Sequence, residues 1–291
     1  MDPVLMTREW SAHEINSKLP RRSFTISHLS RGKGPGCRAV ALARNLRVLE
    51  QNGIRYAGGG ENIIDAHRPV ILNRNGTRIG FLVYACMVFP FQHAATEQVP
   101  GIASMRINTY YQPPKSLDKP GTPPKVTTVP DPGELERMQD DISRLKRQAD
   151  IVIVSYHWGI SHHTELLDYQ IEVAHEAIDA GADVIMGHGN HELGALEVWK
   201  EKPVFYGLAN FVFDWYKMRD RKDGLLVKVD VRARDLDRVS FVPLRRNNGN
   251  YPVLLDPNEG DGAQLFQIVK ERSAGLSSLI LEGMEINVEL E

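Results

Sequence analysis

Two short apolar runs separated by a helical pattern constrain the fold of this chain most strongly. Residues 151–154 form a continuous β-branched run, typical of a strand buried on both faces, and residues 184–186 form a second apolar run. Residues 169–180 lie between them with helical spacing and end at Gly181. This order predicts two parallel strands joined by a crossover helix, and hence an α/β fold.

Composition narrows the class of protein. Of the 291 residues, 42% are hydrophobic and 25% are charged, which allows a sizeable core. The formal net charge of -2 gives no reason to expect nucleic-acid binding. The only cysteines, Cys37 and Cys86, are too few for a disulfide framework. No signal peptide or membrane segment is readable, so the sequence as written predicts a cytoplasmic protein, or an extracytoplasmic one if its N-terminus is truncated.

Other local patterns predict the rest of the domain. An Asn75-Gly76 pair between two apolar runs indicates a hairpin, and residues 90–132, rich in Pro, Thr and Gly, indicate a long ordered loop or subdomain. Helices are predicted at residues 39–49, 134–147 and 263–272, and further strands at 54–57, 70–72, 79–85, 196–199, 204–206, 225–231 and 239–245.

Histidines follow both buried runs. His157 comes directly after the first strand, His188 comes directly after the second, and His191 follows three residues later. Open α/β sheets place ligand sites at the carboxyl ends of parallel strands, and imidazole is a good ligand for transition metals. The three histidines therefore predict a shared metal site. The alternative is that each histidine merely ends its strand.

Four further residues near these strands have competing interpretations. His162 and His163 could line a substrate mouth, although exposed, solvated histidines are the default interpretation. Asp214 could hold a histidine N–H or cap a turn. His175 lies inside the predicted 169–180 helix and is interpreted as structural.

Several sequence blocks in the same order carry a resemblance to a known family: residues 150–159, 168–175, 178–191, 197–199 and 202–211, with 49–62 and 108–111 upstream. Together they resemble the CapA family, the capsule or poly-γ-glutamate synthesis proteins related to calcineurin-like metallophosphatases. The resemblance spans about residues 37–246. Residues 189–192 also spell Gly-Asn-His-Glu, a metallophosphoesterase signature that we interpret here as coincidental.

The resemblance implies a four-layer α/β/β/α sandwich with a two-metal centre of manganese, zinc or iron between the sheet ends. His157 and His188 would serve one metal and His191 the other, while His191 or His163 would protonate a leaving group. The family's early Gly-Asp, Asn-Leu-Glu and Asn-Asn-His blocks are not found before Cys37. We therefore expect an N-terminally incomplete sandwich whose metals are weakly bound or absent.

The expected organisation is a poorly matching segment at 1–36, a CapA-like domain at 37–246 and a C-terminal extension with a helix at 247–291. The function implied is a metal-dependent phosphoesterase-type hydrolase by ancestry, linked to capsule or poly-γ-glutamate synthesis. The alternative is an inactive scaffold or binding component, or a truncated gene product, so enzymatic activity stays open. The expected partner is a phosphate-containing or anionic polymer, with self-association through an unpaired sheet edge and without nucleic acid.

Overall fold

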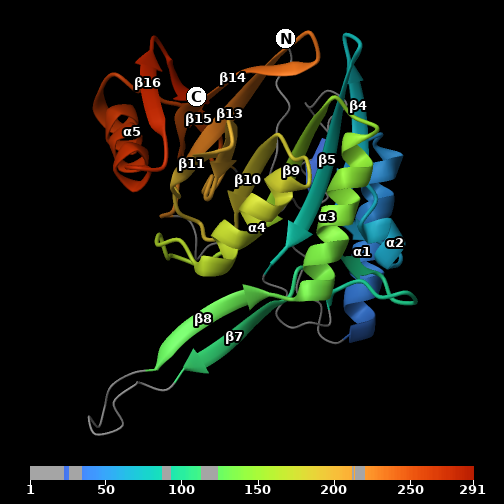
Figure 1. Ribbon diagram of the computed structural model, residues 1–291. Helices are drawn as coiled ribbons and strands as arrows, with labels where there is room; N and C mark the ends of the chain where they lie inside the picture. The colour runs from blue at the N-terminus through green and yellow to red at the C-terminus, as the bar shows by residue number, and fades with distance from the viewer. Residues whose placement is uncertain (1–22, 26–34, 87–92, 113–123, 212, 214–219) are drawn as a thin grey trace, which may run out of the picture.

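The computed structural model of the chain describes residues 23–25, 35–86, 93–112, 124–211, 213 and 220–291 (Figure 1). Asp214, for which two roles were considered, therefore lies outside the described residues, as does most of the segment 1–36. Within the described part, the fold is a mixed α/β arrangement of several sheets and few helices. No helix in that part is long and apolar enough to cross a membrane.

A six-stranded sheet forms the centre of the molecule. Its strand order is β11-β12-β10-β9-β5-β4, and β9 runs parallel to both β10 and β5. The parallel β9–α4–β10 unit predicted from the sequence is thus confirmed. The bounds are β4 Val70–Arg74, β5 Thr77–Ala85, β9 Ile151–His157, α4 Asp168–Asp179, β10 Val184–His188, β11 Leu196–Trp199 and β12 Lys202–Phe205.

Two helices cover one face of this sheet (Figure 1). Helix α3, Pro132–Lys146, begins after Asp131, whose carboxylate accepts hydrogen bonds from the first backbone N–H groups. Met138 and Ile142 of α3 pack in the same core cluster as Val152 of β9, and all three side chains are fully buried. Burial of such side chains against the sheet contributes roughly 1.5–3 kcal/mol each.

A five-stranded sheet packs against the other face. Its order is β13-β14-β17-β16, with β15 paired to β14. One core cluster joins Phe81 and Ile153 of the first sheet to Phe241 and Ile286 of the second. Residues 247–291, expected to add a helix, add three strands as well. The bounds are β13 Asp223–Arg232, β14 Asp235–Arg246, β15 Pro252–Leu254, α5 Gly260–Arg272, β16 Ser278–Glu282 and β17 Glu285–Glu289.

The N-terminal elements lie along the β4–β5 side of the central sheet (Figure 1). Strand β1 pairs with β2 in parallel, and Ala57 of β2 belongs to the core cluster between the two large sheets. Leu42 and Leu46 of helix α1 pack against Ala85 and Ile102. The bounds are β1 Ser23–Thr25, α1 Pro35–Gln51, β2 Arg55–Ala57, β3 Gly59–Gly60, α2 Ile63–Ala66 and β6 Gly101–Ile102.

The sequence predicts the hairpin between β4 and β5, but not a second hairpin at residues 107–130. Asn75 and Gly76 connect β4 to β5 with φ angles of 51° and 84°, as a type I′ turn requires, so that prediction is confirmed. Strands β7, Ile107–Gln112, and β8, Lys125–Pro130, form an antiparallel arm that projects from the body (Figure 1). This arm lies within the 90–132 segment, for which the sequence predicts a long ordered loop or subdomain.

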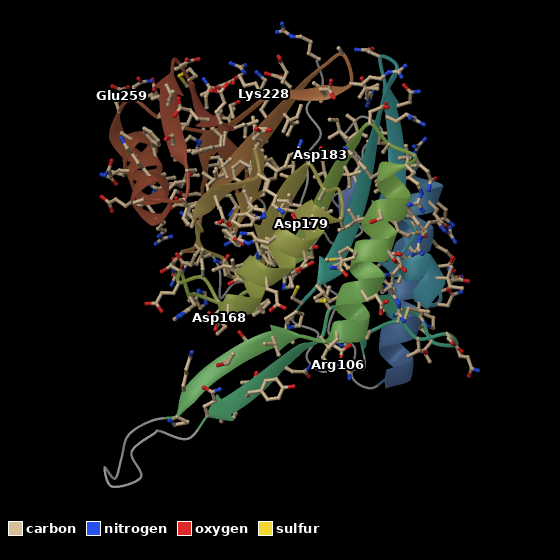
Figure 2. All side chains as sticks on the ribbon, in the orientation of Figure 1. Arg106, Asp168, Asp179, Asp183, Lys228 and Glu259 are labelled. Carbon is tan, nitrogen blue, oxygen red and sulfur yellow. The ribbon has the colours of Figure 1, made fainter. Side chains whose placement is uncertain are left out.

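The two ends of β10 have different environments. Asp183 precedes the strand, is almost fully buried, and accepts hydrogen bonds from Lys146 Nζ and Val152 N at 2.6 and 2.8 Å (Figure 2). Lys202 Nζ lies 3.1 Å from the same carboxylate. Ion pairs therefore stabilise the amino-terminal end of β10. The histidine that follows its apolar residues lies at the carboxyl end.

Candidate functional site

His157 and His188 end adjacent parallel strands and lie side by side. They are register partners across β9 and β10, and their ring centroids are 5.3 Å apart at an interplanar angle of 76°. The structure therefore brings together two of the three histidines of the predicted metal site. Their pairing follows directly from the parallel register, because equal strand positions meet at the same edge of a sheet.

The strand ends are held tightly. The Nε2 atom of the buried His188 lies 3.1 Å from Ser155 Oγ, and the His188 carbonyl accepts a hydrogen bond from Trp158 N at 2.8 Å. Gly189 has a φ of +111°, and a Cβ there would lie 3.0 Å from His157 Nε2. Only glycine suits both the backbone conformation and the space beside this histidine.

His191 lies on the loop that leaves β10, with a φ of 61°. Its Nδ1 is 2.8 Å from Asn210 Oδ1, and its ring centroid is 5.1 Å from that of Phe213 and 6.2 Å from that of His162. The contacts of His191 thus include two loops beyond its own. Asn210 fills the orienting role for a histidine N–H that the sequence had suggested for Asp214.

His162 and His163 lie on the loop after β9, and both side chains are exposed, at 42% and 46%. His163 Nε2 is 3.6 Å from Glu165 Oε2, while the His163 carbonyl accepts from Asn190 Nδ2 at 3.3 Å. The Asn190 carbonyl in turn accepts from His162 N at 2.8 Å. Asn190 therefore connects the loop after β9 to the loop after β10, and the His163 side chain is exposed to solvent.

Three of the nine described non-glycine residues with positive φ lie in the same loops. His162, His191 and Ala209 have positive φ angles of 65°, 61° and 54°. Non-glycine residues rarely adopt this conformation, which costs of order 1–3 kcal/mol each and persists where surrounding contacts enforce it. Enforced strain of this kind concentrates at functional sites. The other six lie in other turns, so positive φ alone does not distinguish the histidine loops.

The described side chains do not complete a metal site. Among the residues that the structure describes, no group of three or more His, Cys, Asp or Glu residues is placed to hold a metal ion. Glu192, the carboxylate of the Gly-Asn-His-Glu stretch, is ion-paired with Arg221. His157 and His188 supply two neutral donors, whereas a divalent ion needs about four ligands and carries charge that a carboxylate normally offsets.

A stack of buried aromatic rings lies on the helix-covered side of the sheet. Successive ring centroids of Tyr84, Tyr156, Trp158 and Tyr206 are 5.7, 4.7 and 5.7 Å apart. Trp158 Nε1 donates to the Tyr206 carbonyl at 2.9 Å. Burial, reinforced by the Glu197 carboxylate that accepts from its hydroxyl, raises the pKa of Tyr206, so this phenol stays protonated. The stack gives the histidine-bearing strands a rigid base.

Sequence reasoning missed Ser155 and Asn210. Ser155 is part of the apolar β9 strand, so it had no pattern that separated it from a core residue. Asn210 lies in the 202–211 block that carried the family resemblance, and an amide directly after a run of apolar residues was the available signal.

Comparison with known proteins identifies relatives over most of the chain. The family model of the bacterial capsule synthesis protein PGA_cap matches residues 38–215. The capsule biosynthesis protein CapA of Bacillus anthracis is 30% identical over 269 residues, covering 91% of this chain and 58% of that protein. The PGA biosynthesis protein CapA of Bacillus subtilis (strain 168) is 39% identical over 105 residues, covering 35% and 27%.

A probable polyglutamine synthesis accessory protein of Mycobacterium tuberculosis (strain CDC 1551 / Oshkosh) is 34% identical over 180 residues, covering 60% of this chain and 41% of that protein. The chain thus spans 58% or less of the length of these three curated relatives. A hypothetical protein from Thermus thermophilus overlaps in structure with a TM-score of 0.33 and 14% identity, over 80% of this chain and 84% of that one. So low a score carries no weight for the fold.

Proposed function

This chain belongs to the family of the bacterial capsule synthesis protein PGA_cap, and we propose that it acts in the synthesis of an anionic capsule polymer of the poly-γ-glutamate type. Capsule, PGA and polyglutamine synthesis are named for the three relatives. Because the chain spans only part of those proteins, the activity of the whole protein is part of this proposal.

The proposed framework is the four-layer α/β/β/α sandwich of the metallophosphatases. Two features support it: the two large sheets share one core cluster, and α3 and α4 cover the outer face of the first.

The pairing of His157 with His188 at the carboxyl ends of β9 and β10 is the single observation that supports a functional centre here. In this proposal the centre binds a phosphate-type or carboxylate-type oxyanion of the polymer or its precursor. His191 and His163 are the candidates for moving a proton at that centre. His191 is the stronger candidate, because Asn210 orients its ring, whereas the His163 side chain is half exposed to solvent.

Two forms of this function differ in their chemistry. A metallophosphoesterase-type hydrolase would require manganese, zinc or iron and further ligands from outside the described residues. A binding or scaffold component of polymer synthesis would need no catalysis. The second form is favoured by Glu192, whose carboxylate forms an ion pair with Arg221.

Polymer yield in a host that lacks its own copy of this gene tests the proposal. The host would receive the wild-type gene, the His157→Ala/His188→Ala double variant, or Tyr251→Ser as a control at a side chain 71% exposed. We expect wild type and the control to restore the polymer. Loss of polymer in the double variant, with the protein still folded, supports a functional histidine centre. Full polymer in the double variant supports the scaffold form, and full polymer without the gene would refute the proposal.

Metal content separates the same two forms. We expect weak retention of manganese or zinc after dialysis against chelator and then against the metal, because the described residues supply two adjoining imidazoles rather than a complete ligand set. Elemental analysis gives the stoichiometry. A tightly held pair of ions would show that ligands from outside the described residues complete the site.

A further inference from the structure

The side-chain amide of Asn210 has only one orientation that its surroundings allow. Asn210 Nδ2 lies 3.1 Å from the main-chain carbonyl oxygen of Arg221. A carbonyl oxygen can only accept hydrogen bonds, so the NH₂ end of the amide must face it. The reversed amide would place two lone-pair-bearing oxygens against each other. The other end, Oδ1, therefore faces His191.

This orientation decides which nitrogen of His191 carries a proton. Asn210 Oδ1 can only accept, and it lies 2.8 Å from His191 Nδ1. The hydrogen bond therefore requires Nδ1–H. In the neutral ring, the lone pair is then on Nε2. The tautomer of a histidine is usually inferred from the hydrogen bonds around its ring. Here the inference starts from the Arg221 carbonyl, which can only accept a hydrogen bond.

The carbonyl is itself held from the second sheet. The guanidinium of Arg246, at the end of β14, donates from Nη2 to the Arg221 carbonyl at 2.5 Å and from Nη1 to the Phe213 carbonyl. Arg246 is 3% exposed and Asn210 is 5% exposed, so water competes little for these bonds. Loss of one partner in such a buried network costs roughly 1–3 kcal/mol.

We infer that Asn210 is a positioning residue that holds His191 in the Nδ1–H form, so that Nε2 is the nitrogen that acts on a ligand or proton. The relay Arg246–Arg221 carbonyl–Asn210–His191 ties the histidine loop of the first sheet to the end of the second. The functional consequence rests on the proposed function, in which His191 takes part in the site. The tautomer itself does not depend on that proposal.

Ring-nitrogen NMR of the full chain, labelled with ¹⁵N-histidine, tests the inference. Spectra would be recorded about two pH units above the ordinary imidazole pKa of ~6.5, where the rings are neutral, and His191→Gln would identify the signals. We expect wild type to show protonated Nδ1 and lone-pair Nε2. Asn210→Leu removes the acceptor for Nδ1–H and should shift the ring mainly to the Nε2–H form that imidazole prefers in water.

Asn250→Gly is the matched control, because Asn250 has a φ of 65° that glycine adopts without strain. Asn250 Oδ1 also accepts from Arg246 Nη1, so its removal disturbs the same guanidinium without removing the acceptor for His191. This variant should leave the His191 tautomer unchanged. A wild-type ring in the Nε2–H form would overturn the inference, and that measurement needs no variant other than the His191→Gln protein that identifies the signals. Nδ1–H that persists in a folded Asn210→Leu protein would overturn it too.

The polymer assay separates this inference from the proposed function. If His191 acts in the site, Asn210→Leu should lower polymer yield on the order of 10-fold or more, as loss of the hydrogen-bond partner that orients a metal-ligating histidine does. Unchanged yield in His191→Gln, together with the expected tautomer shift, would refute the role of His191 and leave the positioning by Asn210 intact.

Discussion

Gly187 is the position where one added methyl group should damage both the fold and the site. It is buried in β10, directly before His188. A Cβ at Gly187 would lie 2.3 Å from Trp158 Nε1, 2.5 Å from the Tyr206 carbonyl oxygen and 2.7 Å from the Phe205 carbonyl oxygen. Two of these atoms belong to backbone and the third to a fully buried indole, so none can yield cheaply.

The size of the effect follows from two contributions. Forcing a methyl group into a close-packed core costs about 1–3 kcal/mol. The new methyl also lies against both atoms of the 2.9 Å hydrogen bond from Trp158 Nε1 to Tyr206 O. Breaking that bond leaves a buried donor and acceptor unsatisfied, which adds roughly 1–3 kcal/mol. We expect Gly187→Ala to lower the free energy of unfolding by about 2–6 kcal/mol.

Urea denaturation followed by circular dichroism measures this difference. Gly133→Ala is the matched control, because Gly133 is in the first turn of α3 and the nearest atom to its added Cβ is 3.6 Å away. Alanine is the better helix former by up to about 1 kcal/mol, so the control should be neutral or slightly stabilising. If Gly187→Ala were as stable as Gly133→Ala, the packing beneath the histidines would be looser than described.

Three further outcomes are expected. Gly76→Ala should cost about 1 kcal/mol in a urea melt, because the turn needs a φ of +84° although the space around the Cβ is open; an unchanged midpoint would contradict this. Burial alone would raise the pKa of Asp141, but its hydrogen bonds, led by the one with His67, outweigh burial and lower the pKa. The ionised carboxylate therefore stabilises the fold at pH values above its ordinary pKa, and this stabilisation is lost as the pH falls through the lowered pKa. Asp141→Asn should therefore lower the free energy of unfolding near neutral pH, and its difference from wild type should shrink below about pH 4. A difference in free energy that did not change with pH would argue against these hydrogen bonds to the ionised carboxylate. Burial raises the pKa of the Cys86 thiol well above its ordinary value, so in a Cys37→Ser background a thiol reagent should label Cys86 only after unfolding.

Local patterns were sufficient where a strand or turn is determined by its own residues. The β9–α4–β10 unit and the Asn75–Gly76 turn were predictable because burial on two faces and positive φ leave signatures within a few residues. Strands β16 and β17 were missed. Each is five residues long, they are joined by Gly283 and Met284, and β17 completes the second sheet only through pairing with β14, more than 40 residues earlier in the chain. A local signal was nevertheless present, because residues 285–289 alternate polar and apolar side chains as a half-buried strand does.

The candidate site also has one part that local sequence patterns predict and one part that they do not. The contact between His157 and His188 could be predicted, since both end strands that parallel register places side by side. The orientation of His191 could not, because it depends on Asn210, on a carbonyl 11 residues further on, and on Arg246 at the end of β14. Those partners meet only once the second sheet has packed on the first. It follows that the strand-end pair is a property of the first sheet alone, whereas the protonation form of His191 requires both sheets, so variants that loosen β14 should alter the histidine loop before they disturb His157 and His188.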